Sequence, residues 1–253
     1  MKIFKVMLVA LVAMLGFSSC EKHECDDHTA DLVGTWTCLR EDFAEALVIS
    51  ADGSVISTGC DGKEYWENVK GKIVIEDGKA KMTFEDNDNY EGHFDIIPGM
   101  AFSICNDVAG RFTYNYCKED LAEEIVGMWV CNFNSPDDES EMMIETFYDN
   151  GKSVLTGFLP MEDGSEHVLN NETNYKVVGD LLFIEIPADK VGGEKPQYVV
   201  DRLIYSPNGT TLGDIMTLKT LVEAENQITE VAMSFLRIKE SLSLSGEIGR
   251  AHV

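Results

Sequence analysis

Few residues in this sequence combine the types and the spacing that metal binding requires. The stretch 85–91 (EDNDNYE) collects carboxylate and amide oxygens, which are the ligands that Ca²⁺ takes. It lacks the glycine and the distant glutamate of an EF-hand loop, so a solvated hairpin loop is the simpler interpretation. The acidic stretch 136–141 (PDDESE) is of the same kind. His23 and His28 flank Cys25, but a metal ion would need a folded scaffold to fix these side chains.

Catalytic motifs are also missing from the sequence. It contains no G-x-S-x-G, P-loop or H-E-x-x-H pattern, and no C-x-x-C spacing that would suit zinc. Only His93 and His167 lie within the stretches that we expect to fold, and neither has a partner that the sequence identifies. We therefore predict a protein that is not an enzyme and that uses no cofactor or metal ion.

Aromatic residues are the remaining candidates for ligand contact. Tyr65 and Trp66 follow an Asp-Gly pair and carry rings that could stack on sugars. Neighbours on a strand point to opposite faces, so only one of the two rings could face a ligand. Half-buried packing against the rest of the sheet is the simpler interpretation.

The charge of the chain is strongly negative. Asp and Glu number 45 against 20 Lys and Arg, which gives a formal net charge of −25. Such a surface repels phosphate backbones and anionic lipid headgroups. We therefore expect no nucleic-acid partner and no electrostatic docking to a membrane.

The first twenty residues have the features of an export signal. Lys2 and Lys5 form a basic start, an apolar run covers 6–17, and two small serines precede Cys20. As a helix, the twelve-residue apolar run would be about 18 Å long. This length is too short to cross a bilayer core of about 30 Å. The segment is therefore predicted to direct export and not to span the membrane.

This arrangement resembles the lipobox of bacterial lipoproteins, in which the signal is removed ahead of a cysteine whose thiol is then acylated. The resemblance implies a signal peptide over 1–19, lipid attachment at Cys20 and a short acidic tether over 20–30. It also implies that the membrane is a partner through this anchor, at the bacterial outer membrane, with the protein facing the periplasm or exposed at the surface. Plain secretion with an ordinary Cys20 is the alternative.

The pattern Gly-x-Trp-x-Cys occurs at 34–38 and again at 127–131. After each copy, apolar and polar residues alternate with a period of two and are interrupted by Asp-Gly or Asn-Gly pairs, which is typical of antiparallel hairpins. We therefore predict an all-β protein with two domains, over 31–118 and 125–240, joined by residues 119–124. Good helix formers in this joint indicate one or two helical turns.

Turn pairs divide the first domain into short strands. After the strand that carries Trp36, we expect strands near 44–50, 54–60, 64–70, 72–76, 80–85, 91–96, 101–105 and 110–117. In the second domain Gly179 aligns with Gly71, and additional residues are expected in loops at 159–171 and 188–196.

The cysteines after Cys20 permit disulfides in an exported protein. Cys38 and Cys131 occupy equivalent positions in the two copies, which is typical of a small buried residue used twice. Free buried thiols are therefore favoured over a full set of disulfides for the remaining six: Cys25, Cys38, Cys60, Cys105, Cys117 and Cys131.

A Gly-x-Trp at the start of the first strand of an antiparallel meander resembles the lipocalin signature. In that family the Trp closes one end of a small barrel, and an Arg from the last strand packs across its ring. The resemblance implies two up-and-down lipocalin-like barrels in tandem, with Trp36 and Trp129 as barrel-end residues and Arg237 over Trp129. Tyr116 stands at the position of the arginine in the first copy. The chain as a whole resembles the tandem lipocalin-like lipoproteins of Bacteroidetes.

Two functions of different class fit these observations. The first is a lipid-anchored binding protein that holds a small apolar ligand or a glycan in a barrel. The second copy is the better candidate, because side chains alone fill a narrow eight-stranded barrel and the second copy is the longer one. The second function is an envelope module with packed barrels that contacts another protein through its acidic surface.

The end of the sequence differs from the rest. Residues 247–253 (EIGRAHV), within a tail over 241–253, resemble the in-frame translation of a sequencing adapter. We expect them not to belong to the natural protein, and we exclude His252 from any site.

Overall fold

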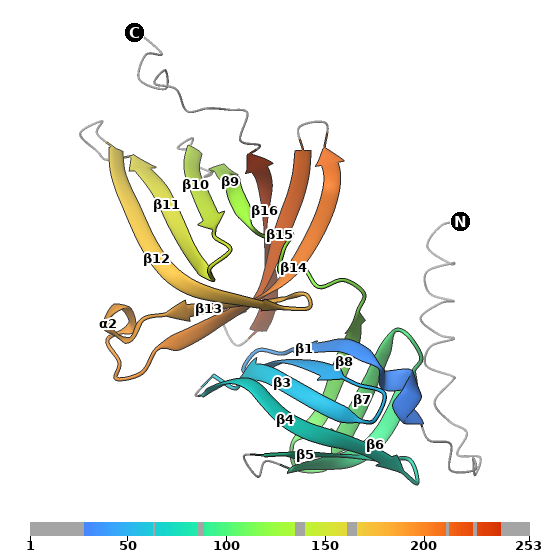
Figure 1. Cartoon of the computed structure of the whole chain (residues 1–253). Coiled ribbons are helices and arrows are strands. Elements are labelled where there is room, and N and C mark those ends of the chain that lie inside the picture. The colour runs from blue at the N-terminus through green and yellow to red at the C-terminus, as the bar shows by residue number, and fades with distance from the viewer. Residues whose placement is uncertain are drawn as a thin grey trace.

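The chain folds into two closed antiparallel barrels of eight strands each, β1–β8 and β9–β16 (Figure 1). Every strand pairs with the next along the chain, and the last strand of each barrel pairs with its first, so both barrels are up-and-down meanders. This arrangement confirms the predicted all-β fold with two tandem barrels. The computed structural model describes residues 28–62, 64–85, 89–134, 140–160, 166–210, 213–224 and 227–238. The predicted signal peptide, Cys20 and the tail 241–253 lie outside these residues.

The first barrel follows a short 3-10 helix, η1 (His28–Leu32). Pairing of β1 with β8, which places Trp36 opposite Tyr116, closes this barrel. Its strands are β1 (Gly34–Leu39), β2 (Ala44–Ile49), β3 (Ser54–Cys60), β4 (Tyr65–Glu76), β5 (Lys79–Phe84), β6 (Asn89–Ile97), β7 (Ala101–Asn106) and β8 (Gly110–Cys117).

The described residues of the second barrel include one short helix, α2 (Ala188–Val191), between the fifth and sixth strands. Within the described part of the chain, no helix has the length and apolar character needed to cross a membrane. The strands of the second barrel are β9 (Gly127–Asn134), β10 (Ser140–Phe147), β11 (Lys152–Pro160), β12 (Glu166–Val178), β13 (Leu181–Ile186), β14 (Gln197–Thr210), β15 (Gly213–Ala224) and β16 (Gln227–Ile238).

Tight turns join the strands at several of the predicted Asp-Gly and Asn-Gly pairs, whereas the predicted turn at Asn208-Gly209 lies within β14, at a register shift. Between β2 and β3, Gly53 has a φ of 78°, and between β4 and β5, Asp77 and Gly78 have φ values of 51° and 71°. Glycine adopts this left-handed region without steric cost, and aspartate tolerates it better than most residues. The local chemistry of these pairs therefore sets the hairpins that build the barrels.

One continuous strand stands where two were predicted. β4 runs through Gly71, so the stretches 64–70 and 72–76 belong to the same strand. Gly71 is required for space and not for a turn, because a Cβ atom there would lie 2.5 Å from Cδ1 of Phe84. Gly179, with a φ of 62°, instead lies in the turn between β12 and β13. The predicted equivalence of Gly71 and Gly179 is therefore wrong, and the counterpart of Gly179 is the turn between β4 and β5.

The additional residues of the second barrel lengthen its strands more than its loops. β12, β14, β15 and β16 contain 13, 14, 12 and 12 residues, whereas β4, β6, β7 and β8 contain 12, 9, 6 and 8. Most described residues of the expected loop 159–171 belong to β11 or β12, and the expected loop 188–196 contains α2. In a barrel, an added residue finds hydrogen-bond partners on neighbouring strands, which favours strand extension over a free loop.

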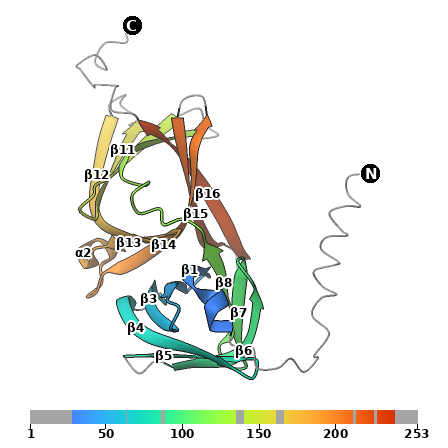
Figure 2. The same ribbon diagram turned by 45° about the vertical axis from the view of Figure 1, so that its right-hand side comes forward.

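An apolar interface joins the two barrels. The outer face of the first barrel contributes Ala44, Ala46 and Cys60, and the outer face of the second contributes Leu181 and Phe183. Each of these residues is at most 7% exposed. Both views show this end of the second barrel, with β13 and β14, next to β1 of the first (Figures 1 and 2).

The turn at Gly179 fits closely against the first barrel. A Cβ atom at Gly179 would lie 2.9 Å from Cγ2 of Thr35 and 3.2 Å from Sγ of Cys117. Its carbonyl oxygen accepts a hydrogen bond of 3.1 Å from the amide of Leu121, in the joint between the barrels. The joint itself forms hydrogen-bonded turns, in which the amide of Ile125 donates to the carbonyl of Leu121 and the amide of Val126 donates to the carbonyl of Glu123.

Candidate ligand-binding site in the second barrel

The tryptophan that opens each barrel lies at its base. Trp36 and Trp129 are both fully buried. The indole Nε1 of Trp36 donates a hydrogen bond of 2.6 Å to the carbonyl oxygen of Leu32, and that of Trp129 donates one of 2.7 Å to the carbonyl oxygen of Ile125. In both barrels the acceptor lies four residues earlier, in the segment that leads into the first strand. The two indoles therefore make the same hydrogen bond to the segment that precedes their strand.

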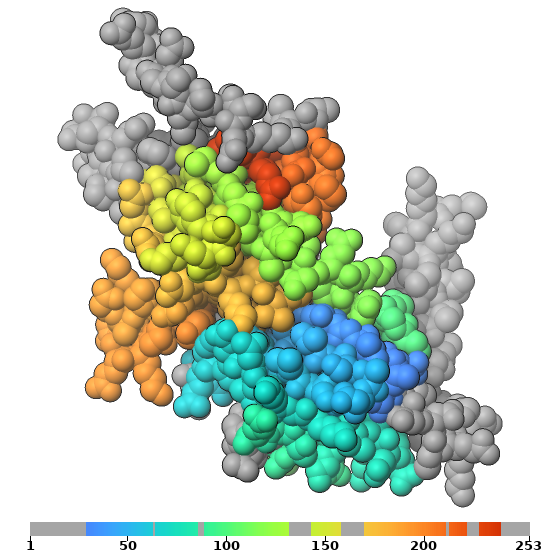
Figure 3. All heavy atoms as spheres, viewed as in Figure 1, coloured from blue at the N-terminus to red at the C-terminus, as the bar shows by residue number. Residues whose placement is uncertain are grey.

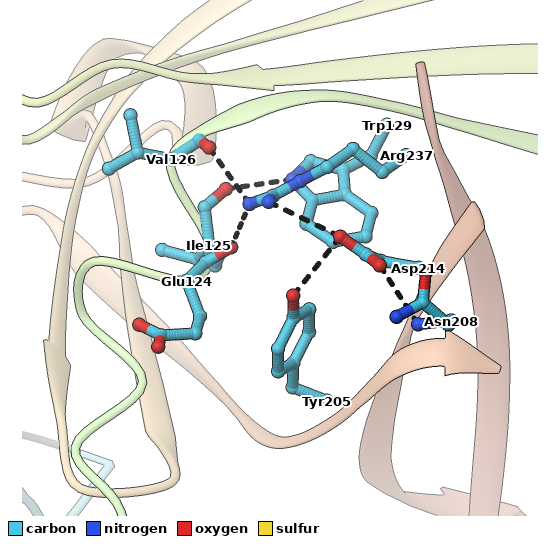
Figure 4. Close-up of polar contacts among 8 residues, drawn as sticks. All are labelled: Glu124, Ile125, Val126, Trp129, Tyr205, Asn208, Asp214 and Arg237. Atoms are coloured by element: carbon cyan, nitrogen blue, oxygen red, sulfur yellow. Dashed lines mark hydrogen bonds and ion pairs between the residues drawn. The ribbon is translucent and has the colours of Figure 1, made fainter. Parts of the chain in front are cut away.

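Arg237 covers the ring of Trp129 in the second barrel (Figure 4). The two residues lie opposite each other on β16 and β9, and the arginine Cζ is 4.7 Å from the ring centroid. Nη1 lies 3.4 Å from Oδ2 of Asp214, and Nη2 donates hydrogen bonds to the carbonyl oxygens of Glu124 and Val126. A cation–π contact of this kind contributes about 0.5–2 kcal/mol. The guanidinium thus links the last strand, the indole and the segment before β9.

Asp214 connects this arginine to the C-terminal part of β14. Its Oδ2 accepts a hydrogen bond of 3.1 Å from the hydroxyl of Tyr205, and its Oδ1 accepts one of 2.9 Å from the amide of Asn208 (Figure 4). The base of the second barrel is therefore closed by a polar network around a buried indole.

Aromatic packing replaces that network at the base of the first barrel. Tyr116 lies opposite Trp36, where Arg237 lies in the second barrel, and the two ring centroids are 5.0 Å apart. Phe102 packs on Trp36 at the same distance. The barrel is closed although its last strand carries no arginine at this position.

Aromatic side chains also close the far end of the first barrel. Phe43 packs against Trp66 and Phe112 at 6.0 and 5.0 Å between ring centroids, and Tyr90 packs on Phe112 at 5.0 Å. The guanidinium of Arg40 covers the Phe112 ring at 4.8 Å. The first barrel is therefore packed from its base to its far end.

Two inward-facing valines are exposed toward the end of the second barrel away from Trp129. Val199 lies on the same face of β14 as the core residue Leu203, and Val231 on the same face of β16 as the core residue Phe235. Both valines therefore point into the barrel, yet they are 37% and 44% exposed. We call the space that they border the mouth. The large apolar residues exposed on strands of the first barrel instead point outward: Val48, Ile56, Val74 and Ile97.

Two buried carboxyl groups lie inside the second barrel, one toward its base and one toward the mouth. Glu145 lies opposite Trp129 and is 7% exposed, and Asp201 is 4% exposed on the inward face of β14. Glu145 is hydrogen-bonded to the hydroxyl of Ser153, and Asp201 accepts a hydrogen bond from the hydroxyl of Thr220. We call Glu145 and Asp201 the carboxyl pair.

Burial changes the acidity of both groups. Loss of hydration on burial is the largest effect on Glu145, and the negative charge of Asp201 is the second; together they raise the pKa of Glu145 to about 7. The hydrogen bond with Ser153 acts in the opposite direction and lowers this pKa. Burial also raises the pKa of Asp201, against the hydrogen bond from Thr220. Among the described residues, no lysine or arginine contributes to either shift. The carboxyl pair therefore favours a proton or a cation inside the second barrel and disfavours an anion.

Sequence reasoning did not single out the carboxyl pair. Met143, Glu145 and Phe147 share the inward face of β10, and Asp201 lies between Val199 and Leu203 on that of β14. The available signal was a charged residue on an otherwise apolar face. That signal becomes visible only once the inward face of each strand is known.

The structure separates the other residues that the sequence suggested. Tyr65 and Trp66 point to opposite faces of β4, as the alternation predicts. Trp66 points into the first barrel, whereas Tyr65 faces the second barrel and stacks on Tyr198 with 4.1 Å between centroids. His93 is largely exposed on β6, and His167 belongs to β12.

Metal and disulfide chemistry find no support among the described residues. No group of three or more His, Cys, Asp or Glu side chains is arranged there to hold a metal ion. His23, Cys25, residues 86–88 of the oxygen-rich stretch and residues 136–139 of the acidic stretch lie outside that part of the chain. The five described cysteines are free: Cys38, Cys60 and Cys131 are buried, Cys117 is half-buried and Cys105 is exposed.

Comparison with known proteins identifies no family for this chain. No protein-family model matches the sequence, and no curated protein matches it. Among solved structures, a porin-like protein from Bacteroides uniformis ATCC 8492 is similar over 81% of this chain and 95% of that one, with 9% sequence identity and a TM-score of 0.19. That score is too low to support an inference about shared architecture or function.

Proposed function

We propose that this chain is a non-enzymatic, lipid-anchored protein of the bacterial outer membrane, with lipocalin-like barrels of which the second binds a small apolar molecule. The observation that carries the proposal is the exposure of Val199 and Val231 on the inward faces of a closed barrel. Apolar side chains that line a concave, water-filled space gain free energy when an apolar ligand covers them. The lipobox-like segment that ends at Cys20 supports the anchor.

The carboxyl pair supports a further choice between apolar ligands. A fatty-acid carboxylate inside the barrel would add a third negative group to the interior that holds Glu145 and Asp201, where low dielectric strengthens the repulsion. A neutral hydroxyl or an ammonium group carries no such penalty, and an ammonium is attracted. The expected ligand is therefore a neutral or cationic amphiphile and not a fatty acid.

Three probes with the same ten-carbon chain test this proposal. Decanol, decylamine and decanoate are added separately to the full chain at neutral pH, and the melting temperature is measured. We expect decanol and decylamine to raise the melting temperature and decanoate to leave it unchanged. A ligand at a hundredfold excess over its Kd stabilises the folded state by about 2.7 kcal/mol, which such a measurement detects.

Matched variants locate the site. Val231→Trp fills the mouth and should abolish both shifts, whereas Ile204→Trp, at a residue that is 41% exposed on the outer face of the same barrel, should preserve them. The double variant Glu145→Gln and Asp201→Asn should admit decanoate and leave the response to decanol intact. If none of the three probes changes the melting temperature, the binding proposal fails, and the alternative of packed barrels that contact another protein replaces it.

A further inference from the structure

A groove of about 520 Å³ runs along the contact between the two barrels, apart from the mouth. Tyr65 and Glu67 of β4 line it from the first barrel, and Lys176, Glu185 and Tyr198 line it from β12, β13 and β14 of the second. Figure 3 shows the two surfaces meeting here, blue to cyan for the first barrel and yellow to orange for the second. Its volume lies within the range of about 300–1,000 Å³ that is usual for small-molecule sites, which favour domain interfaces.

The groove has an aromatic floor. The rings of Tyr65 and Tyr198 stack almost parallel, with 4.1 Å between centroids and 12° between planes. The edge of Phe183, which is 1% exposed, supports Tyr65 from below at 5.9 Å. One ring comes from each barrel, so the floor exists only when the two barrels are docked. Half-buried tyrosines of this kind combine an apolar ring with a hydroxyl that can hydrogen-bond.

The rim of the groove is polar and has both donors and acceptors. Nδ2 of Asn174 donates a hydrogen bond of 3.2 Å to Oε2 of Glu185, and Lys176 forms an ion pair with Glu67 of the other barrel. Asn150 lines the groove at the turn between β10 and β11. Planar amide and carboxylate groups with fixed neighbours match ligands that carry several hydroxyls, since each hydroxyl can donate and accept.

The charge and the strand pairing disfavour other ligand classes. Glu67 and Glu185 against Lys176 leave one net negative charge at the rim, within a chain of formal charge −25, so anionic ligands are repelled. β4, β12, β13 and β14 each have two paired neighbours within closed barrels, so a peptide finds no free edge on which to add a strand. The polar rim is unsuited to a wholly apolar molecule.

From this geometry we infer that the groove between the barrels binds a neutral oligosaccharide, with a sugar ring on the Tyr65–Tyr198 stack and hydroxyls on Asn174, Glu185 and Lys176. This site is separate from the mouth and takes a different class of ligand. It would give the protein two binding functions, one inside the second barrel and one at the junction.

Isothermal titration of the full chain with maltotriose, cellotriose, mannotriose and trigalacturonate tests the inference. We expect at least one of the three neutral sugars to bind with a Kd below about 1 mM, and trigalacturonate to bind at least about tenfold more weakly than that sugar. Absence of binding by all three neutral sugars overturns the inference. Equal or tighter binding of trigalacturonate also overturns it.

Variants connect the binding to the groove. Tyr198→Ala should weaken the neutral sugar at least about tenfold, and Tyr198→Phe, which keeps the ring, should retain binding within about threefold. If Tyr198→Ala fails to fold, as judged by circular dichroism, Asn174→Ala replaces it with the same expected loss. Val231→Trp blocks the mouth and should leave sugar binding unchanged. Loss of sugar binding in Val231→Trp, or full binding in the folded groove variants, contradicts the inference.

Discussion

The two barrels have the same number of strands and the same buried tryptophan at the base, but they differ in height and in what fills them. Strands of 6 to 9 residues in the first barrel, such as β6 and β7, correspond to strands of 14 and 12 residues in the second. Aromatic side chains close the first barrel at both ends, whereas the second presents exposed valines inside its far end. Longer strands beyond the buried tryptophan therefore create a mouth.

The buried carboxyl group of the first barrel has more hydrogen-bond donors around it than that of the second. In the first barrel Glu45 accepts hydrogen bonds of 2.5 Å from the hydroxyls of both Ser57 and Tyr114, and Ser57 in turn accepts one of 2.7 Å from Nε1 of Trp66. In the second barrel Glu145 has one such neighbour and lies near a second acid. A carboxyl in a packed interior is surrounded by donors, whereas Glu145, with fewer donors, keeps hydrogen-bonding capacity for a ligand.

The largest expected difference concerns the base of each barrel. Arg237→Met should lower the free energy of unfolding by about 3–5 kcal/mol, because it removes the guanidinium from Asp214, whose side chain is 13% exposed. Tyr116→Phe, at the matching position, should cost less than about 1 kcal/mol because the ring contact with Trp36 remains. Urea unfolding followed by circular dichroism measures both values. Equal effects would show that the two bases are held by the same kind of contact.

The next difference is a pH dependence that Glu145 gives to the second barrel. The pKa of this carboxyl is about 7 in the folded state against 4.5 as its ordinary value, so its protonated form favours folding. The corresponding stability is present below pH 4.5 and is lost as the pH rises through about 7, which amounts to about 3 kcal/mol.

Glu145→Gln isolates this contribution. The stability of the natural chain relative to this variant should fall between acidic and mildly alkaline pH, as measured by urea unfolding across the range. Glu172→Gln, which changes an exposed carboxyl on β12, is the control and should keep the pH dependence of the natural chain. If the difference in unfolding free energy between the natural chain and Glu145→Gln does not change with pH, the raised pKa of Glu145 is contradicted.

The smallest difference concerns added volume. Ile104→Phe in the first barrel should lower the free energy of unfolding by about 1–3 kcal/mol, because Ile104 is fully buried in a packed interior. Val231→Phe in the mouth should change it by less than about 0.5 kcal/mol, because the valine is 44% exposed. Melting temperatures of the two variants provide the comparison. Equal losses would indicate that the second barrel is as full as the first.

Local chemistry explains why the sequence predicted the hairpins and the base of the second barrel. The Asp-Gly pairs need left-handed backbone, and that need is readable without knowing any distant contact. The lipocalin resemblance implies that Arg237 packs over Trp129, and the structure places its guanidinium 4.7 Å from the ring centroid.

Other features depend on contacts that the sequence does not display. Gly71 and Gly179 look alike as residues, but one makes room for Phe84 inside a strand and the other forms a turn. Pro160 and the asparagines at 170 and 171 are typical of a loop, yet they lie on β11 and β12 because neighbouring strands supply their hydrogen-bond partners. The carboxyl pair could not be selected from 45 acidic residues before the register of the strands was known.

The close fit of the Gly179 turn against Thr35 and Cys117 has a consequence for the orientation of the whole chain. Two domains joined only by a linker can rotate independently, but two barrels packed at this contact rotate together. If Cys20 carries the fatty-acyl chain that we propose, the membrane would hold the two barrels as a single body. The second barrel could then reorient its opening only together with the first.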